Sequence, residues 1–146
     1  MPESSKITTS SGPSAGAPPN PACAQMDVSS MARAYMVCAL WSSVTHDHRP
    51  MDDVADIDDI DGATANTMCE ECQDFVNANF NDIEEFMGKG YNLEAVGHDL
   101  WLTRNGHGAG FWDRGAGAVG NRLTVAAKAE GSRDLCLGDD GKVYSS

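Results

Sequence analysis

The chain has 146 residues, 41% of them hydrophobic, which suits one globular domain with a modest core. No apolar run is long enough to cross a bilayer, so we expect no membrane association. The net charge of −12 repels nucleic-acid phosphates and argues against direct nucleic-acid binding. A polar N-terminus without a basic-then-apolar signal pattern predicts a cytoplasmic protein. In that setting the five unevenly spaced cysteines are expected to be reduced.

The first residues differ in composition from the rest of the chain. Residues 1–26 are rich in Ser, Thr, Pro, Gly and Ala and contain few bulky apolar side chains. Such a segment cannot repay its ordering entropy, so we expect a disordered tail ahead of a single domain at 27–146. Apolar residues at helical spacing then predict helices at about 29–44 and about 64–87, the second ended by Gly88.

The negative charge is concentrated in one segment. Between Asp47 and Glu85 there are thirteen acidic residues and one arginine, while the rest of the chain is balanced. Such a segment either keeps the protein in solution or attracts a basic protein surface, including one that normally binds nucleic acid.

Two patterns in this region resemble metal sites. A calcium loop with Gly62 at its sixth position would place Ile57 and Met68 where carboxylates are required, so an EF-hand is rejected. Cys69 and Cys72 stand at i and i+3 on the expected helix and form a weak candidate zinc pair, because no second such pair supplies the other two ligands. We therefore expect no metal and no cofactor.

The stretch 97–115 mixes bulky apolar, ionisable and glycine residues more densely than any other. A short helical turn at 93–96, ended by Gly97, leads into it. Alternation over 99–104, a turn at 105–108 with residues that accept a positive φ, and a return at 109–113 together predict a β-hairpin.

The C-terminal part is predicted to add a helix and a second hairpin. Apolar residues place a helix at 121–130, and a turn at Asp139-Asp140-Gly141 separates two short strands within 134–146. The expected fold is therefore α+β, with two N-terminal helices followed by hairpin, helix and hairpin, and the hairpins forming a small antiparallel sheet.

Residues 98–114 read HDLWLTRNGHGAGFWDR. This segment resembles a motif in a family of small uncharacterised proteins encoded by bacteriophages, prophages and plasmids. Weaker similarity extends over roughly residues 30–146. The family has no established activity, so the resemblance implies a setting only: an accessory product of a phage or mobile element in the bacterial cytoplasm.

The expected hairpin carries two candidate sites for chemistry. Arg104, His107 and Arg114 beside the glycines can bind an anion such as a nucleotide phosphate, although a plain turn also explains the glycines. His98 or His107 with Asp99 or Asp113 can form an acid–base pair or ligate a metal. The alternative is that Asp–Arg pairs hold the two strands together.

The aromatic residues of the hairpin allow a third interpretation. Trp101, Phe111 and Trp112 either form an exposed recognition surface or belong to the core. The sequence leaves both open.

Three functional hypotheses follow. The first is a non-enzymatic accessory protein whose acidic surface mimics nucleic-acid charge and binds a basic host protein, for example as a counter-defence inhibitor. The second is a small enzyme acting on a nucleotide or other phosphorylated ligand through Arg104, His107 and Arg114. The third is a virion or assembly component.

Overall fold

The computed structural model describes residues 27–107 and 110–145, and the expected tail at 1–26 lies outside them. Its α-helices and strands are α2 (Ser29–Ser42), α3 (Gly62–Ala78), α4 (Phe80–Gly88), α5 (Leu93–Arg104), α6 (Ala118–Ala129), β1 (Leu135–Leu137) and β2 (Val143–Ser145). Short 3-10 helices are η1 (Met51–Asp53), η2 (Ile57–Asp59) and η3 (Phe111–Arg114).

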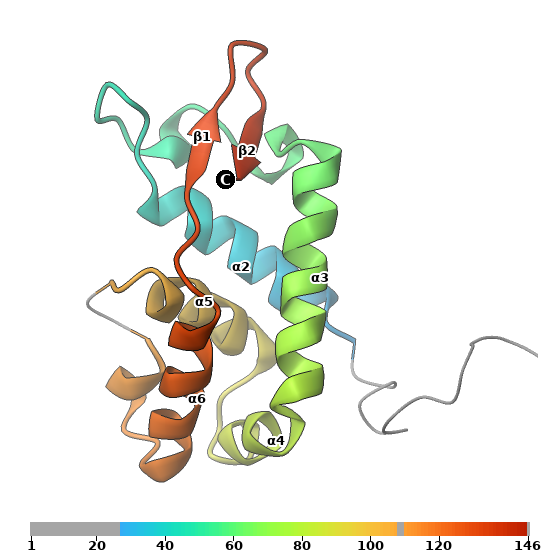
Figure 1. The fold of residues 1–146 in the computed structure, drawn as a ribbon, viewed down its shortest axis with the longest axis vertical. Coiled ribbons are helices and arrows are strands. Elements are labelled where there is room, and N and C mark those ends of the chain that lie inside the picture. Colours follow the sequence, from blue (N-terminus) through green and yellow to red (C-terminus); the bar gives the residue numbers. More distant parts are fainter. Residues whose placement is uncertain (1–26, 108–109, 146) are drawn as a thin grey trace, which may run out of the picture.

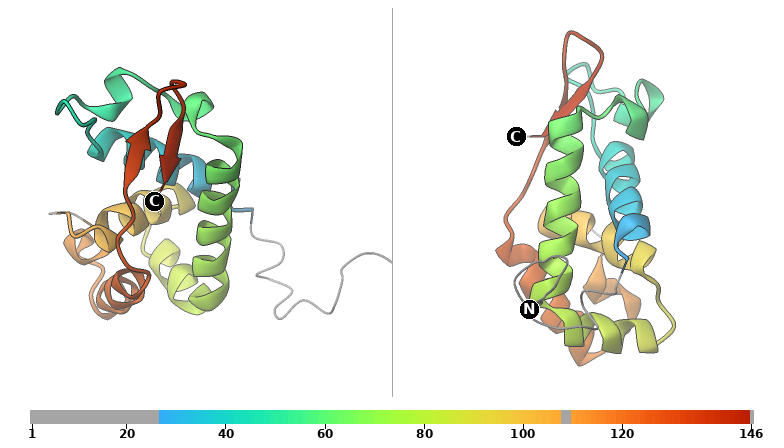
Figure 2. Two further views of the ribbon diagram at one scale, coloured as in Figure 1. Left: turned by 45° about the horizontal axis from the view of Figure 1, so that its top comes forward. Right: turned by 90° about the vertical axis from the view of Figure 1, so that its right-hand side faces the viewer.

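The described chain is mostly helical with one small antiparallel sheet, which confirms the predicted α+β class. The sheet pairs Leu135 with Ser145 and Leu137 with Val143, as a C-terminal hairpin requires. Figures 1 and 2 show α3 running the length of the molecule, with the sheet and α2 beside its first half. Helices α4 and α6 lie at its other end, and α5 lies between α2 and α6.

The predicted β-hairpin at 97–115 is wrong. Residues 93–104 form the single helix α5, and residues 111–114 form η3. Eight of the twelve residues of α5 are buried, including charged ones, so the helix has no polar face to reveal its period. A short buried helix and a strand cannot be distinguished by apolar pattern under these conditions.

Gly97 has a different role from the expected one. It lies inside α5 instead of ending a helical turn, because α5 crosses α2 at this point. A Cβ atom at position 97 would lie 2.2 Å from the backbone oxygen of Met31. The glycine is therefore required by the close approach of two helices.

The acidic helix expected at 64–87 is divided in two. Asn79, with φ −126° and ψ 30°, separates α3 from α4, and its side-chain amide donates to the backbone oxygen of Phe75 at 3.0 Å. The change of direction turns Phe80, Ile83 and Phe86 toward the core.

Aromatic side chains form the centre of the core. Phe111 of η3 stacks on Phe75 at 6.0 Å and meets the edge of Phe86 at 5.5 Å, both measured between ring centroids. Tyr35 and Trp101 make an edge contact at 5.3 Å. Two of the aromatic residues of the motif segment therefore hold α2, α3, α4, α5 and η3 together.

The α2–α5 crossing gives the first prediction. Gly97→Ala should lower the free energy of unfolding by about 2 kcal/mol, because the new methyl group forces two backbones apart. Urea unfolding followed by circular dichroism measures this. Gly88→Ala is the matched control, since no atom lies within 4 Å of the added Cβ there. Equal stabilities of the two variants would contradict the close contact between α2 and α5 at Gly97.

Candidate functional site

Arg104, expected to bind a ligand, lies inside the fold with a side chain only 4% exposed. Its guanidinium donates to the hydroxyl of Tyr35 at 2.8 Å and to the backbone oxygens of Gly131 and Glu130 at 2.7 and 2.9 Å. Glu71 lies 3.5 Å away and accepts from Tyr35 at 3.0 Å. Burial raises the pKa of Tyr35, so the hydroxyl stays protonated as a donor.

Asp99 and Arg114, two further candidates, bind each other. Arg114 donates to both carboxylate oxygens of Asp99 at 2.8 and 2.9 Å, and these hydrogen bonds raise the pKa of Arg114. The Asp99 side chain is 2% exposed, so the arginine compensates a buried charge. The pair joins α5 to η3, whereas Asp113 is exposed. An Asp–Arg pair was expected, but between strands.

The aromatic candidates separate into core and surface. Trp101 and Phe111 are buried, while Trp112 is 49% exposed. The three side chains therefore do not form one recognition surface.

The cysteine pair is also divided. Cys69 is exposed and Cys72 is buried on α3, and in the ranges that the structure covers no three His, Cys, Asp or Glu side chains are placed to hold a metal. The residues present do not complete a zinc site.

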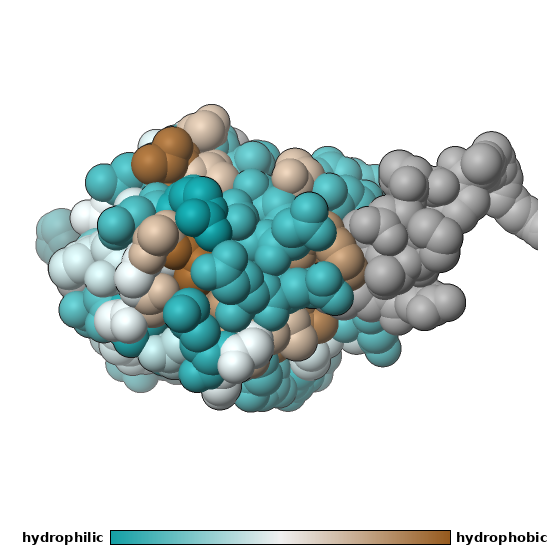
Figure 3. Space-filling model, turned by 90° about the horizontal axis from the view of Figure 1, so that it is seen from below, coloured by the Kyte–Doolittle hydropathy of each residue, from teal (hydrophilic) through white to brown (hydrophobic). Residues whose placement is uncertain are grey.

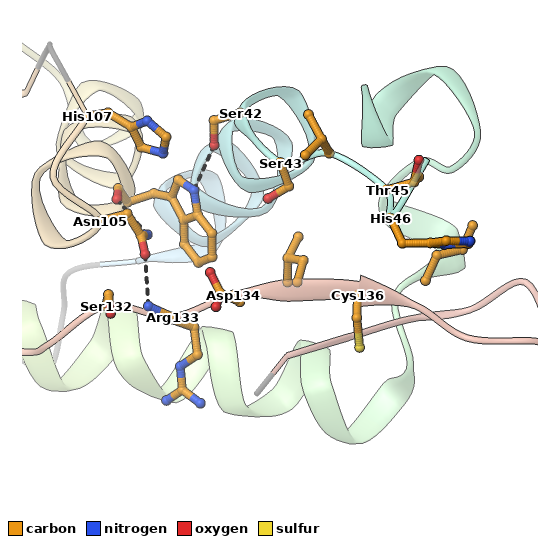
Figure 4. A pocket seen from close by; sticks show the side chains of 14 residues that line it. Ser42, Ser43, Thr45, His46, Asn105, His107, Ser132, Arg133, Asp134 and Cys136 are labelled. Atoms are coloured by element: carbon orange, nitrogen blue, oxygen red, sulfur yellow. Dashed lines mark hydrogen bonds between the residues drawn. The ribbon is translucent and has the colours of Figure 1, made fainter. Parts of the chain in front are cut away.

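His107, another of the candidates, lines a groove of about 670 Å³. The groove is lined by residues 42–46, which begin at the last residue of α2, by Trp101, Asn105 and His107 at the end of α5, and by residues 132–137, which include β1 (Figure 4). Sequence reasoning missed the two segments 42–46 and 132–137, because only the tertiary fold brings them face to face.

Two polar contacts hold the walls of the groove. The Trp101 indole N–H donates to the hydroxyl of Ser42 at 2.8 Å, and the Asn105 amide oxygen accepts from the backbone N–H of Arg133 at 2.8 Å. The Arg133 side chain points away from the groove, where it pairs with Glu71 (Figure 4).

The groove shows no assembled catalytic group. Within the described part of the chain, no hydrogen bond or ion pair joins its two histidines, His46 and His107, to a nucleophile or a carboxylate. Arg104 and Arg114 do not line it. The groove is lined by hydroxyl, amide and apolar groups, and also by the two imidazoles, the Cys136 thiol and the Asp134 carboxylate.

The acidic residues differ in their ion pairing. On α3 and α4, Glu71 pairs with Arg104 and Arg133, and Asp82 and Glu85 both pair with Arg122. Glu70, Asp74 and Glu84 on the same helices form no ion pair with a described residue. The seven aspartates from Asp47 to Asp61 make no ion pair with any described residue.

The segment 47–61, which carries these seven aspartates, lies at the same end of the molecule as the β1–β2 turn, which contains Asp139 and Asp140 (Figure 1). The Asp61 backbone N–H donates to the Val143 oxygen at 2.9 Å, which fixes the loop against β2. Tyr144 donates to Asp140 at 2.6 Å, and this bond, with the charges of Asp140 and Asp61, raises the pKa of Tyr144 to about 12. We call residues 47–61 with Asp139 and Asp140 the acidic end.

Comparisons with known proteins gave no match for this chain among protein-family models, curated proteins or solved structures. Within the described residues, no helix combines the length and the apolar character needed to span a membrane.

The buried guanidinium of Arg104 gives the second prediction. Arg104→Lys should lower the free energy of unfolding by about 3 kcal/mol, because an ammonium cannot reach Tyr35 and both backbone oxygens together. Chemical denaturation measures it. Arg122→Lys is the control, since its ion pairs are on the surface, and it should leave stability unchanged. Equal losses in both variants would contradict the role of Arg104.

The third prediction concerns the thiols. In a Cys23→Ser variant of the folded protein at pH 8, a thiol reagent should label Cys69 and Cys136 and leave Cys38 and Cys72 unreacted. Burial raises the pKa of Cys38 to about 12 and that of Cys72 further, so neither forms thiolate at this pH. Mass spectrometry of labelled peptides identifies the sites. Protection of Cys69 by added zinc would contradict the absence of a metal pair.

Proposed function

We propose that this protein acts by binding and not by catalysis, and that its acidic end engages a basic surface of a partner protein. The observation that carries the proposal is the distribution of ion pairs. Arg104, Arg114, Arg122 and Arg133 are neutralised by acidic residues elsewhere in the fold, while the aspartates of the acidic end remain unpaired among the described residues.

The density of charge supports a partner that normally binds nucleic acid. Seven aspartates occur within fifteen residues, and the turn that contains Asp139 and Asp140 lies at the same end of the molecule. Nucleic-acid-binding proteins present clusters of lysine and arginine to closely spaced phosphates. A rigid array of carboxylates competes for the same cations, and association of this kind is rapid and sensitive to salt.

The face opposite the acidic end is less suited to binding a partner. Figure 3 shows the molecule from below, the side away from the acidic end, as mostly hydrophilic with apolar residues in small separate groups. That face offers no large apolar patch of the kind that marks a stable hydrophobic interface.

The resemblance of residues 98–114 supports a setting for this binding. We propose that the chain is an accessory product of a phage or mobile element, that it acts in the bacterial cytoplasm, and that its partner is a host protein, with inhibition of a defence protein as one outcome. The nucleotide-enzyme hypothesis gains no support, because Arg104 and Arg114 bind internal partners.

The fourth prediction tests the acidic end. Combined Asp52→Asn, Asp53→Asn and Asp58→Asn removes three exposed charges without touching the capping aspartates 56, 59 and 61. At about 0.5 kcal/mol for each exposed charge, affinity for a basic partner should fall about tenfold. The partner is recovered from bacterial lysate at low salt and measured by calorimetry.

The matched control removes the same charge elsewhere. Asp74→Asn, Glu84→Gln and Glu94→Gln are all exposed, lie outside the acidic end, and should change affinity little. Recovery of no stoichiometric partner, or equal weakening by both triple variants, would overturn the proposed function.

A further inference from the structure

The strand β1 has one edge that makes no backbone hydrogen bond to another described segment. The Gly138 N–H donates to the Lys142 oxygen at 2.7 Å, which makes 138 and 142 a hydrogen-bonded pair. Such pairs alternate along an antiparallel ladder, so Leu137 and Val143 form a non-bonded pair, and so do Leu135 and Ser145. The backbone N–H and C=O of Leu135 and Leu137 therefore point away from β2.

The opposite edge of the sheet is occupied. The Val143 oxygen points away from β1, as the same alternation requires, and accepts from Asp61 at 2.9 Å, while Ile60 forms a parallel bridge to Val143. Among the described residues, no segment donates or accepts a backbone hydrogen bond at the outward N–H and C=O groups of Leu135 and Leu137. A sheet edge in this state is a template for another strand.

The groove runs along this open edge. Figure 4 shows β1 as one wall and residues 43–46 as the facing wall. Val44 and Leu137 both line the groove and are 56% and 38% exposed, so each wall contributes an apolar side chain. The space beside the open edge thus provides backbone partners and apolar contacts for an extended chain.

We propose that an extended basic segment of the partner adds to β1 as a third strand in this groove. The proposal rests on the proposed function and names the way in which the partner is held. Pairing with Leu135 and Leu137 supplies the backbone hydrogen bonds, while lysine or arginine residues at either end of the segment meet Asp134, which precedes β1, and Asp139 and Asp140, which follow it.

Charge decides between this occupant and a second copy of the chain. Two copies joined along β1 would bring together two molecules of net charge −12, with Asp134, Asp139 and Asp140 of each beside the shared edge. Like charges at an interface are strongly unfavourable. A basic segment removes that repulsion and neutralises the exposed carboxylates.

The test uses a labelled peptide, fluorescein-Lys-Lys-Val-Thr-Val-Thr-Val-Lys-Lys-amide, titrated with the full chain and followed by fluorescence anisotropy. Leu137→Pro removes the outward N–H at position 137 without removing a β1–β2 hydrogen bond, as proline on an edge strand allows. The matched control Leu137→Thr keeps that N–H. Binding should be at least tenfold weaker for the proline variant than for the threonine variant.

Two further peptides keep the test decisive if the proline variant loses stability. A peptide with all five central amides N-methylated has the same side chains and charge but cannot pair as a strand, so it should bind at least tenfold more weakly. A peptide with glutamate in place of each lysine should not bind. Equal binding of the methylated and unmethylated peptides would overturn strand addition.

A second copy as occupant would also overturn the proposal. Analytical ultracentrifugation should show a species of one chain, and a dimer that Leu137→Pro dissociates would identify the second copy instead. Failure of this inference is distinguishable from failure of the proposed function. Suppose that a lysate partner is lost with the Asp52, Asp53 and Asp58 variant but binds the Leu137→Pro variant normally. Binding through the acidic end would then stand, and strand addition to β1 would be overturned.

Discussion

The arrangement of helices depends on the buried guanidinium of Arg104. It joins the end of α5 to α2 through Tyr35, to α3 through Glu71, and to the end of α6 through the backbone oxygens of Glu130 and Gly131. Removing such a cation from water costs several kcal/mol, and these partners offset that cost only if all are present together. The last carbonyls of α6 also carry the negative end of its dipole, which favours a cation there.

The internal use of arginine determines what the protein presents to solvent. Arg104, Arg114 and Arg133 each pair with an acidic residue that is buried or half-buried, Asp99 or Glu71. Part of the positive charge of the chain is thus neutralised within the fold. Against its nine aspartates the acidic end holds one arginine, Arg49, with Lys142 next to Asp140, so its field is stronger than an even spread of the net charge would give.

The sequence correctly predicted elements that a local residue pattern determines. Its predictions were wrong where tertiary contacts determine the secondary structure. The turn at Asp139-Asp140-Gly141 correctly marked the C-terminal hairpin. Only the first turn of helix α5, at 93–96, was predicted, because eight of its twelve residues are buried and little of its period shows. Gly97 was misread because only the position of Met31 explains it. The groove could not be predicted, since its open edge depends on Asp61 covering β2 and leaving β1 uncovered.

The loop between α2 and η1 links the groove to the acidic end. Val44 lines the groove and bridges to Pro50, while Asp47, three residues later, belongs to the acidic end. His48 adopts a positive φ of 66°, and its N–H donates to the Thr45 oxygen at 2.9 Å, so the loop is fixed in a tight reversal. A strand seated against Val44 would place its flanking residues beside a carboxylate that the fold already holds in position. Backbone pairing and charge pairing would then reinforce each other without reorganising the loop, and preorganisation of this kind preserves affinity.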